Sequence, residues 1–497
     1  MYDILIKNGL IIDGTGSPTL RSEVAIKDGK IAKIARKITE GAETVIDAAG
    51  KVITPGFIDS HSHSDKQFFT CPQQTYKIEQ GITTSIGGQC GGSVCDANSA
   101  EFLDNARGVP LGANLAMLIG HGSIRKAVMG MDNREPTQQE LEAMKTILRD
   151  AMEHGALGVS FGMIYAPSCY AQTPEMIEIA KVVGQYHGIA AIHLRSEGND
   201  LIRAVREFIT VVRESGVRGV ISHHKAAGLQ DNWGKVHTSL RMIEQANDEG
   251  LELYLDAYPY TASSTKFSSS LIPPAWHSRG VEGLLERMED PAEIEQIRQE
   301  YYAKIPDLSH ILLTYAPGAE EYSGMRVNEI AALRGQDQFL AAMDIVRMTK
   351  DSANACFFTM CEEDVETVLA HPRTMICTDS GTIVKATLFH PRGRAAFPRV
   401  LGHYVRERKI VSLPEMIRKM TSMPAAVYGL KTKGLVREGF DADLCIFDPE
   451  TIEDKATYSV PSLRNEGLSY VIVGGKIAAV NAIATGELGG TMLYRDV

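Results

Sequence analysis

The chain has 497 residues, and its 51 Lys+Arg against 62 Asp+Glu give a formal net charge of −11. This acidic balance disfavours nucleic acid and membrane surfaces as partners, because both are bound through clustered Lys and Arg. The N-terminus does not read as a signal peptide, and no apolar run is long enough to predict a membrane-spanning helix. The eight cysteines are scattered singly, as is typical of free thiols in a reducing compartment. We therefore expect a cytoplasmic globular protein.

Both ends of the chain are rich in short β-like segments. Asp3–Lys7 precedes Asn8-Gly9, which is a hairpin turn signal, and Tyr470–Val473 leads through Gly474-Gly475 into another strand. We predict that the two ends form one small composite β domain, made of residues 1–54 and 430–497.

Residues 55–429 alternate strand-like and helix-like runs, which is the pattern of a parallel α/β fold. Helix starts are marked by the capping-box spacing of Thr137 and Glu140 and by Thr173-Pro174. A long interval between the seventh and eighth strands carries charged helical sequence, so we expect an inserted subdomain at about residues 273–355. The prediction is a (β/α)8 TIM-type barrel, with its strands at Val52–Asp59, Ile82–Ile86, Leu115–Ile119, Ala156–Ser160, Ile189–Leu194, Arg218–Ser222, Glu252–Ala257 and Thr374–Thr378.

Histidines follow several of these strands, at the end where barrel enzymes carry their catalytic groups. His61 and His63 are two residues apart, so in extended geometry both point the same way. His193 ends the fifth strand and His223 follows the sixth. A single histidine at a strand end is usually structural, but four of the 14 histidines fall at three strand ends. This coincidence predicts a shared metal site.

Cys90 and Asp379 extend this set. Cys90 lies between glycine pairs, Gly87-Gly88 and Gly91-Gly92, which permit a tight backbone; taken alone it could be a buried free thiol. Cys with several His favours zinc over harder cations. Asp379 follows the eighth strand, where a turn or capping role is the alternative. Beside a metal ion this carboxylate suits the general base of a hydrolase.

In this order the residues resemble the amidohydrolase superfamily, and within it the N-acyl-D-amino-acid deacylases. The resemblance covers essentially the whole chain. It implies zinc-dependent hydrolysis of the amide bond of an N-acyl-D-amino acid, giving a carboxylate and a free D-amino acid. The motifs that carry it are Pro55–His63, Gly88-Gln89-Cys90-Gly91, His193–Glu197, Ser222–Lys225, Tyr258–Thr265, His390-Pro391-Arg392 and Phe397–Gly402.

The resemblance also implies roles for individual residues. One tightly held zinc would be bound by Cys90, His193 and His223. His61 and His63 would form a second, weaker metal position together with Asp379, which is also the expected catalytic base. Asp65 and Glu197 are candidate partners of the histidine rings, and His121 is left open between a supporting and a structural role.

The substrate of such an enzyme is a small anion, so its carboxylate needs fixed cations. The positions implied by the resemblance are Lys225, Arg392 and Tyr165, with Ser263 and Ser264 as weaker candidates. Independently, Lys225 lies two residues beyond His223, so it could face the same cavity. The alternative for Lys225 and Arg392 is solvated surface charge, and for Tyr165 it is packing.

Two other functions stay open. An amidohydrolase that acts on cyclic amides or dipeptides would share the barrel, although cyclic-amide enzymes commonly use a carboxylated Lys where this chain has Cys90. A non-catalytic scaffold would be expected to lose metal ligands. Gln89 and Ser380 depart from the family pattern and leave the side-chain specificity open, with Lys266 as one candidate contact for an acidic side chain. A homo-oligomer is compatible with the sequence.

Overall fold

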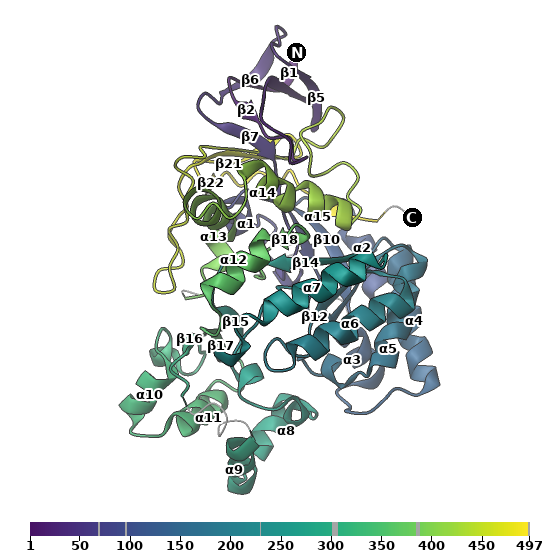
Figure 1. The fold of residues 1–497 in the computed structure, drawn as a ribbon, viewed down its shortest axis with the longest axis vertical. Helices are drawn as coiled ribbons and strands as arrows, with labels where there is room; N and C mark the ends of the chain where they lie inside the picture. Colours follow the sequence, from purple (N-terminus) through teal and green to yellow (C-terminus); the bar gives the residue numbers. More distant parts are fainter. Residues whose placement is uncertain (68–69, 95–96, 229, 301–306, 384–387, 496–497) are drawn as a thin grey trace.

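The computed structural model describes residues 1–67, 70–94, 97–228, 230–300, 307–383 and 388–495. Its centre is a nearly closed barrel of eight parallel strands whose spatial order follows the chain (Figure 1). The predicted (β/α)8 fold is confirmed. The barrel strands are β8 (Phe57–Asp59), β9 (Ile82–Gly87), β10 (Asn114–Gly120), β11 (Gly158–Gly162), β12 (Ile189–His193), β13 (Arg218–Ile221), β14 (Leu253–Ala257) and β18 (Thr374–Ile376).

The barrel strands are apolar because both of their faces are covered. Every residue of β9, β10, β11 and β12 is buried. The surrounding helices bury one apolar side each, and the capping box that starts α4 at Thr137 is present as predicted. These helices are α2 (Ser99–Ala106), α3 (His121–Met129), α4 (Gln138–Glu153), α5 (Thr173–Gln185), α6 (Leu201–Ser215), α7 (Lys235–Asp248), α12 (Glu362–Ala370) and α14 (Leu413–Met420).

Two short β sheets lie at one end of the long axis (Figure 1). One sheet is entirely N-terminal, while the other joins strands from both ends of the chain. The first contains β1 (Tyr2–Lys7), β4 (Glu23–Lys27), β5 (Lys30–Ala35) and β6 (Ala42–Asp47). The second contains β2 (Leu10–Ile11), β3 (Leu20–Arg21), β7 (Val52–Pro55), β19 (Leu444–Phe447), β20 (Leu468–Val473), β21 (Lys476–Val480) and β22 (Ile483–Ala484). The last strand, β23 (Met492–Leu493), pairs with β10 of the barrel.

Two local predictions are corrected by these sheets. Asn8-Gly9 does not close a hairpin: β1 pairs with β4 and β6, whereas β2 pairs with β3 and β7, so the chain changes sheets there. The predicted strand Val52–Asp59 is divided at Gly56 into β7 and β8, which belong to different sheets. A Cβ atom at Gly56 would lie 2.2 Å from Thr83 Oγ1, so only glycine allows this close approach.

The insertion between β14 and β18 lies at the opposite end of the molecule (Figure 1). Its three-stranded antiparallel sheet has the order β15–β17–β16, and a separate hydrophobic core runs from Phe267 to Phe357. β15 of this sheet lies ahead of residue 273 in the chain. Its elements are β15 (Ser263–Lys266), α8 (Gly280–Arg287), α9 (Pro291–Glu300), β16 (Ile311–Tyr315), α10 (Val327–Arg334), α11 (Gln338–Met348) and β17 (Asn354–Phe357).

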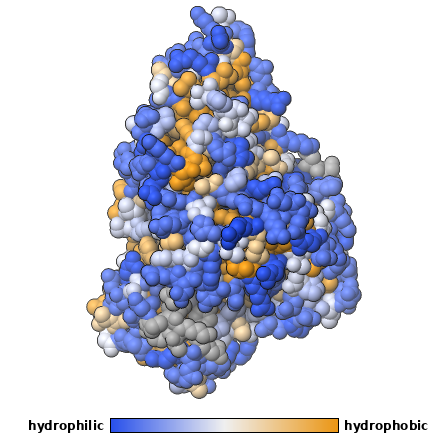
Figure 2. All heavy atoms as spheres, in the orientation of Figure 1, coloured by the Kyte–Doolittle hydropathy of each residue, from blue (hydrophilic) through white to orange (hydrophobic). Residues whose placement is uncertain are grey.

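The face shown in Figure 2 is largely hydrophilic, in keeping with the net charge of −11. Its apolar side chains form scattered patches rather than a continuous band. Membrane-spanning helices are absent from the described residues.

The barrel closes at a seam between β8 and β18, which are the end strands of the sheet order. Lys77 of α1 (Thr75–Ile78) is buried there, and its Nζ donates to Asp59 Oδ2 at 2.7 Å, Thr378 Oγ1 at 2.7 Å and the Ser380 carbonyl at 2.8 Å. The Asp59 carboxylate also accepts hydrogen bonds from the Thr378 amide and hydroxyl. The backbone adds a bond from the Asp379 amide to the His61 carbonyl at 2.9 Å.

Replacing this lysine is expected to open the seam. Lys77→Met leaves the buried Asp59 carboxylate without its cation and should lower the free energy of unfolding by about 3–5 kcal/mol, measured by urea denaturation. Lys33→Met is the matched control, because it breaks the exposed pair with Glu40 and should change little. A loss in Lys77→Met no larger than that in the control would contradict this account.

Candidate metal centre

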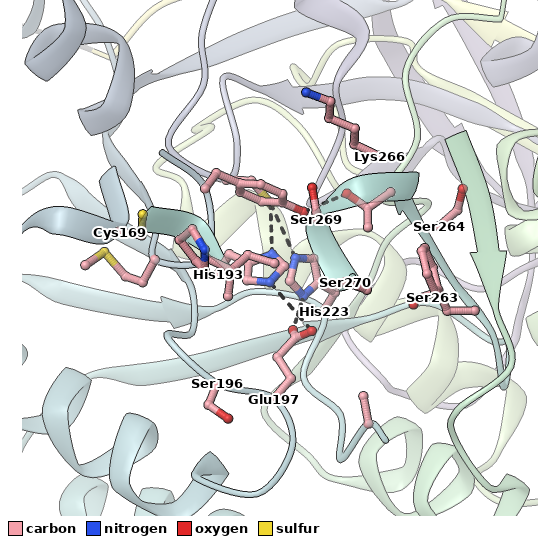
Figure 3. A pocket seen from close by; sticks show the side chains of 18 of the residues that line it. Cys169, His193, Ser196, Glu197, His223, Ser263, Ser264, Lys266, Ser269 and Ser270 are labelled. Carbon is pink, nitrogen blue, oxygen red and sulfur yellow. Dashed lines mark hydrogen bonds and ion pairs between the residues drawn. The ribbon is translucent and has the colours of Figure 1, made fainter. Parts of the chain in front are cut away.

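A cavity of about 1630 Å³ lies between the carboxyl ends of the barrel strands and the inserted subdomain. Its floor contains Cys90, His193, His223 and Asp379. Figure 3 shows His193, His223 and Glu197 close together, with Ser263, Ser264 and Lys266 across the pocket on β15. The sequence-predicted groups that follow six barrel strands (β8, β9, β11, β12, β13 and β18) and those on β15 of the insertion are therefore brought to one site.

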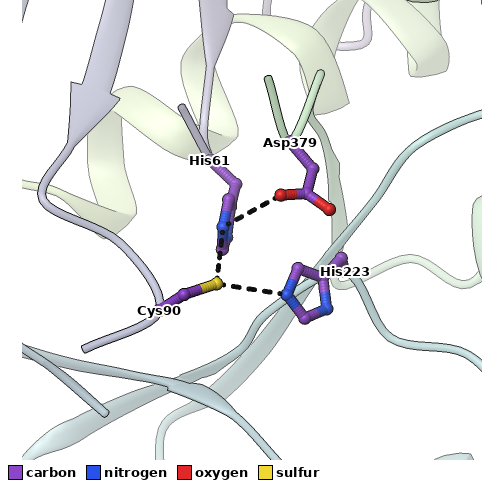
Figure 4. Close-up of side chains that lie close together, drawn as sticks. All are labelled: His61, Cys90, His223 and Asp379. Carbon is purple, nitrogen blue, oxygen red and sulfur yellow. Dashed lines mark hydrogen bonds and ion pairs between the residues drawn. The ribbon is translucent and has the colours of Figure 1, made fainter. Parts of the chain in front are cut away.

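The Cys90 thiol is at the centre of this site. Its Sγ lies 3.3 Å from His61 Nε2, 3.4 Å from His223 Nε2 and 3.7 Å from His193 Nδ1. Figure 4 shows His61, Cys90, His223 and Asp379 pointing toward one another. Asp379 Oδ1 lies 3.6 Å from His61 Nε2 and 3.3 Å from His63 Nε2, so all six predicted metal ligands converge.

Glycine explains how Cys90 reaches this place. A Cβ atom at Gly88 would lie 1.8 Å from the Leu118 carbonyl oxygen, and one at Gly91 would lie 2.6 Å from the Gly162 amide. The loop therefore packs its backbone directly against β10 and β11, and only glycine fits at both positions.

Three of the converging residues have left-handed backbone conformations. Their φ angles are 54° at Cys90, 36° at His223 and 46° at Asp379. Positive φ is uncommon for residues other than glycine and clusters at functional sites, where the surrounding structure enforces it. Here each one turns a side chain inward from the end of a barrel strand.

The charges of the site are strongly coupled. Burial raises the pKa of the Cys90 thiol, but His61 and His223 outweigh burial and hold that pKa well below its ordinary value. Burial likewise disfavours ionised Asp379, yet Arg392 foremost, followed by the histidines, keeps its pKa well below the usual range. Burial lowers the pKa of His223 and the Lys225 cation lowers it further, but nearby anions, led by Asp379, raise it to about 9. The site thus stabilises a thiolate and a carboxylate among imidazoles.

This donor set fits a zinc ion. Ligands at 2.0–2.3 Å from a tetrahedral zinc lie about 3.5 Å from one another. The separations from Cys90 Sγ to the three histidine nitrogens, 3.3–3.7 Å, match that spacing. A thiolate with imidazole nitrogens is also the chemistry that zinc prefers over calcium or magnesium.

Two carboxylates contact the histidines from outside this ring. Glu197 lies 3.0 Å from His223 Nδ1 and 3.6 Å from His193 Nε2, which are the nitrogens turned away from Cys90. Asp256 Oδ1 accepts the His223 amide at 2.6 Å and lies 3.6 Å from His61 Nδ1. Carboxylates in these positions orient metal-binding imidazoles. Glu197 is as the sequence suggested, whereas Asp256 was missed, although an aspartate within an apolar strand was a readable signal.

Asp65 and His121 lie elsewhere. Asp65 Oδ2 accepts the Val94 amide at 3.0 Å and holds the loop that follows Cys90. His121 is buried. Its Nε2 is hydrogen-bonded to Glu175 Oε1 at 2.9 Å, and its Nδ1 is hydrogen-bonded to Ser168 Oγ at 2.8 Å. Both residues therefore support the framework around the cavity.

The predicted carboxylate-binding groups line the same cavity. Arg392 Nη2 donates to the Ser264 carbonyl at 3.0 Å, and its Nη1 contacts Asp379 Oδ2 at 2.8 Å. The Tyr165 hydroxyl lies 3.0 Å from Thr265 Oγ1. Lys225 already contacts Glu197 Oε1 at 2.6 Å.

Comparison with known proteins agrees with this architecture. A D-aminoacylase from Alcaligenes xylosoxydans xylosoxydans is 33% identical, over 99% of this chain and 98% of the relative. The structure of N-acyl-D-glutamate deacylase from Bordetella bronchiseptica, complexed with zinc and a phosphonate mimic of the tetrahedral intermediate, superposes with a TM-score of 0.85 at 33% identity, covering 99% of both chains. A D-aminoacylase with a binuclear metal centre, for which one-metal activation and second-metal attenuation are described, has a TM-score of 0.85 at 32% identity over all of both chains.

A parallel barrel with Cys, His and Asp donors at the carboxyl ends of its strands defines the class of metal-centred (β/α)8 barrels. The model of the amidohydrolase family matches residues 44–263 and 286–479. The chain belongs to the amidohydrolase family.

The outer carboxylates can be tested through metal affinity. Asp256→Asn removes the charge beside His61 and weakens acceptance of the His223 amide, so it should weaken divalent metal binding by about 10–100-fold. Competition with a chromophoric chelator measures the affinity. Asp344→Asn, which alters an ion-pair network in the insertion away from the centre, should leave it unchanged. Equal affinities in the Asp256 variant and the unaltered chain would remove the assigned role.

Proposed function

We propose that this chain is a zinc-dependent N-acyl-D-amino-acid deacylase, which hydrolyses a linear amide to a carboxylate and a free D-amino acid. The observation that carries the proposal is the convergence of Cys90 with His61, His193 and His223 beside the Asp379 carboxylate. Cys90, His193 and His223 would hold one tightly bound zinc, while His61, His63 and Asp379 would form a second position. When bound, zinc supplies a Lewis acid for the acyl oxygen and lowers the pKa of water.

The chain's own residues supply the proton transfers and the orientation. Asp379 accepts a proton from the attacking water and later donates it to the departing amine. Arg392 binds the substrate α-carboxylate, with Lys225 and Tyr165 completing the pocket and the Ser263 and Ser264 positions forming its wall. A carboxylate fixed at one side of the metal centre presents only one enantiomer's amide bond for attack.

Arg392 links substrate binding to the strength of the base. In this structure its guanidinium is paired with Asp379 and is the main cation that keeps the pKa of Asp379 low. A carboxylate held in this way is a weak base. When the substrate carboxylate takes over part of the guanidinium, the pKa of Asp379 rises and proton transfer to it becomes easier.

The Cys90 position favours this activity over cyclic-amide hydrolysis. The described cavity presents a thiol at the point where a carboxylated lysine would bridge two metals, and its lysine near the metal ligands, Lys225, is paired with Glu197. Its carboxylate-binding groups also suit a linear, anionic substrate. We place the enzyme in the cytoplasm, on the sequence evidence of free thiols.

A turnover screen tests the proposal directly. Matched N-acetyl-D and N-acetyl-L amino acids with acidic, aromatic and aliphatic side chains, together with a cyclic amide such as a hydantoin, are offered to the zinc-loaded enzyme. We expect release of free amino acid from the D series alone. Activity confined to the L series or to the cyclic amide would refute the proposal.

The role of Asp379 is tested by Asp379→Asn. Because the amide cannot accept the water proton, we expect kcat to fall by about 10²–10⁴-fold, while metal analysis still finds the tightly bound zinc at Cys90. Near-normal turnover would remove the assigned role. Loss of the zinc would show instead that Asp379 is needed to hold the metal.

A further inference from the structure

The side chain of the D-amino acid is not fixed by family membership. This chain is 33% identical both to a D-aminoacylase and to a deacylase of N-acyl-D-glutamate. An acidic substrate carries a second carboxylate, which needs a cation of its own in the cavity. The state of the cavity's cations therefore bears on the choice between uncharged and acidic side chains.

Lys266 is the cation of the cavity whose position suits contact with the side chain of the substrate. It is the last residue of β15, whose preceding residues contact the predicted substrate-binding groups: the Ser264 carbonyl accepts from Arg392, and the Thr265 hydroxyl meets Tyr165. Ser264, Thr265 and Lys266 all line the cavity, so this end of β15 forms one of its walls. Figure 3 shows it across the pocket from Glu197.

This cation is already paired. The Nζ of Lys266 donates to Asp351 Oδ2. The Asp351 side chain is 1% exposed and lies outside the cavity lining, while that of Lys266 is 37% exposed and lines it. The His277 ring is 3.9 Å from the same oxygen, and its pKa is lowered by burial, so it adds no competing charge near neutral pH.

Separating Lys266 from Asp351 is energetically unfavourable. Its second oxygen, Oδ1, is buried without a hydrogen bond. Removing the cation from a buried carboxylate is strongly unfavourable. A substrate carboxylate that took Lys266 would leave Asp351 in that state, whereas an uncharged side chain would leave the pair intact.

The other described cations of the cavity are also committed or remote. Arg195 is paired with Glu207 at 3.0 Å. Lys225 and Arg392, which contact Glu197 and Asp379, are the groups already assigned to the substrate α-carboxylate and so are not free for a second one. The fifth, Lys126 on α3, is exposed, so a carboxylate beside it would remain hydrated and gain little.

We propose that Asp351 determines side-chain specificity by holding Lys266 in this ion pair, so that the enzyme prefers N-acyl-D-amino acids with uncharged side chains over D-glutamate and D-aspartate derivatives. The proposal rests on the proposed deacylase function. Asp351 touches no substrate and acts through Lys266.

The test compares two substrates of the same shape, N-acetyl-D-glutamine and N-acetyl-D-glutamate. For the zinc-loaded enzyme we expect kcat/KM to be at least about tenfold higher for the glutamine derivative. Asp351→Asn frees the Lys266 cation and should lower this ratio about tenfold, through a gain on glutamate. Asparagine tolerates the left-handed backbone of this position, where φ is 58°.

Two controls isolate the charge. The double variant Asp351→Asn with Lys266→Gln removes the freed cation and should restore the original ratio. Asp344→Asn alters the pairs with Arg334 and Arg347 in the same subdomain, outside the cavity lining, and should leave the ratio unchanged.

A wild-type enzyme that hydrolyses the glutamate derivative as well as the glutamine derivative would overturn the proposal, and this comparison needs no variant to fold. A ratio unmoved by Asp351→Asn would overturn it as well. Absence of hydrolysis of every N-acyl-D-amino acid is a separate result, which would overturn the proposed function and this inference with it.

Discussion

The hydrogen-bonded ion pair between Lys77 and Asp59 closes the barrel, and the metal centre depends on that closure. His61 and His63 follow β8 directly, while Asp379 follows β18, so the seam between these strands sets the distance between two groups of ligands. Lys77 holds Asp59 on one side and Thr378 and Ser380 on the other, the two residues that flank Asp379. The same hydrogen bonds of Lys77 therefore close the barrel and position the proposed base, Asp379.

The metal centre places positive and negative groups side by side, and each of these buried charges would be unfavourable without the others. The Cys90 thiolate and the Asp379 carboxylate are buried, and each is kept ionised by neighbouring imidazoles or by Arg392. Glu197 and Asp256 balance the histidines from outside. An enzyme with a net charge of −11 can accordingly bind an anionic substrate, because a few fixed cations at the bottom of a cavity decide the local field.

Much of this was predictable from sequence, for identifiable reasons. The barrel strands are apolar runs because both faces are covered, and the ligands sit where those runs end. The sheet change after Asn8 and the break at Gly56 depend on tertiary contacts, namely the partners of β2 and the Thr83 side chain, which no local pattern encodes. The partners of Lys77 and Lys266 escaped prediction for the same reason: Asp59 and Asp351 are distant in sequence and ordinary in context.

The left-handed backbone at Cys90, His223 and Asp379 has an evolutionary consequence. Each of these positions would be conformationally easier for glycine, by a free energy on the order of 1 kcal/mol. Selection for thermal stability alone would therefore tend to replace these three metal-binding side chains. In a directed-evolution experiment on this scaffold, a stability screen without a catalytic one is expected to accumulate glycine at these three strand ends, producing a more stable barrel that keeps only His61, His63 and His193 of the six proposed ligands.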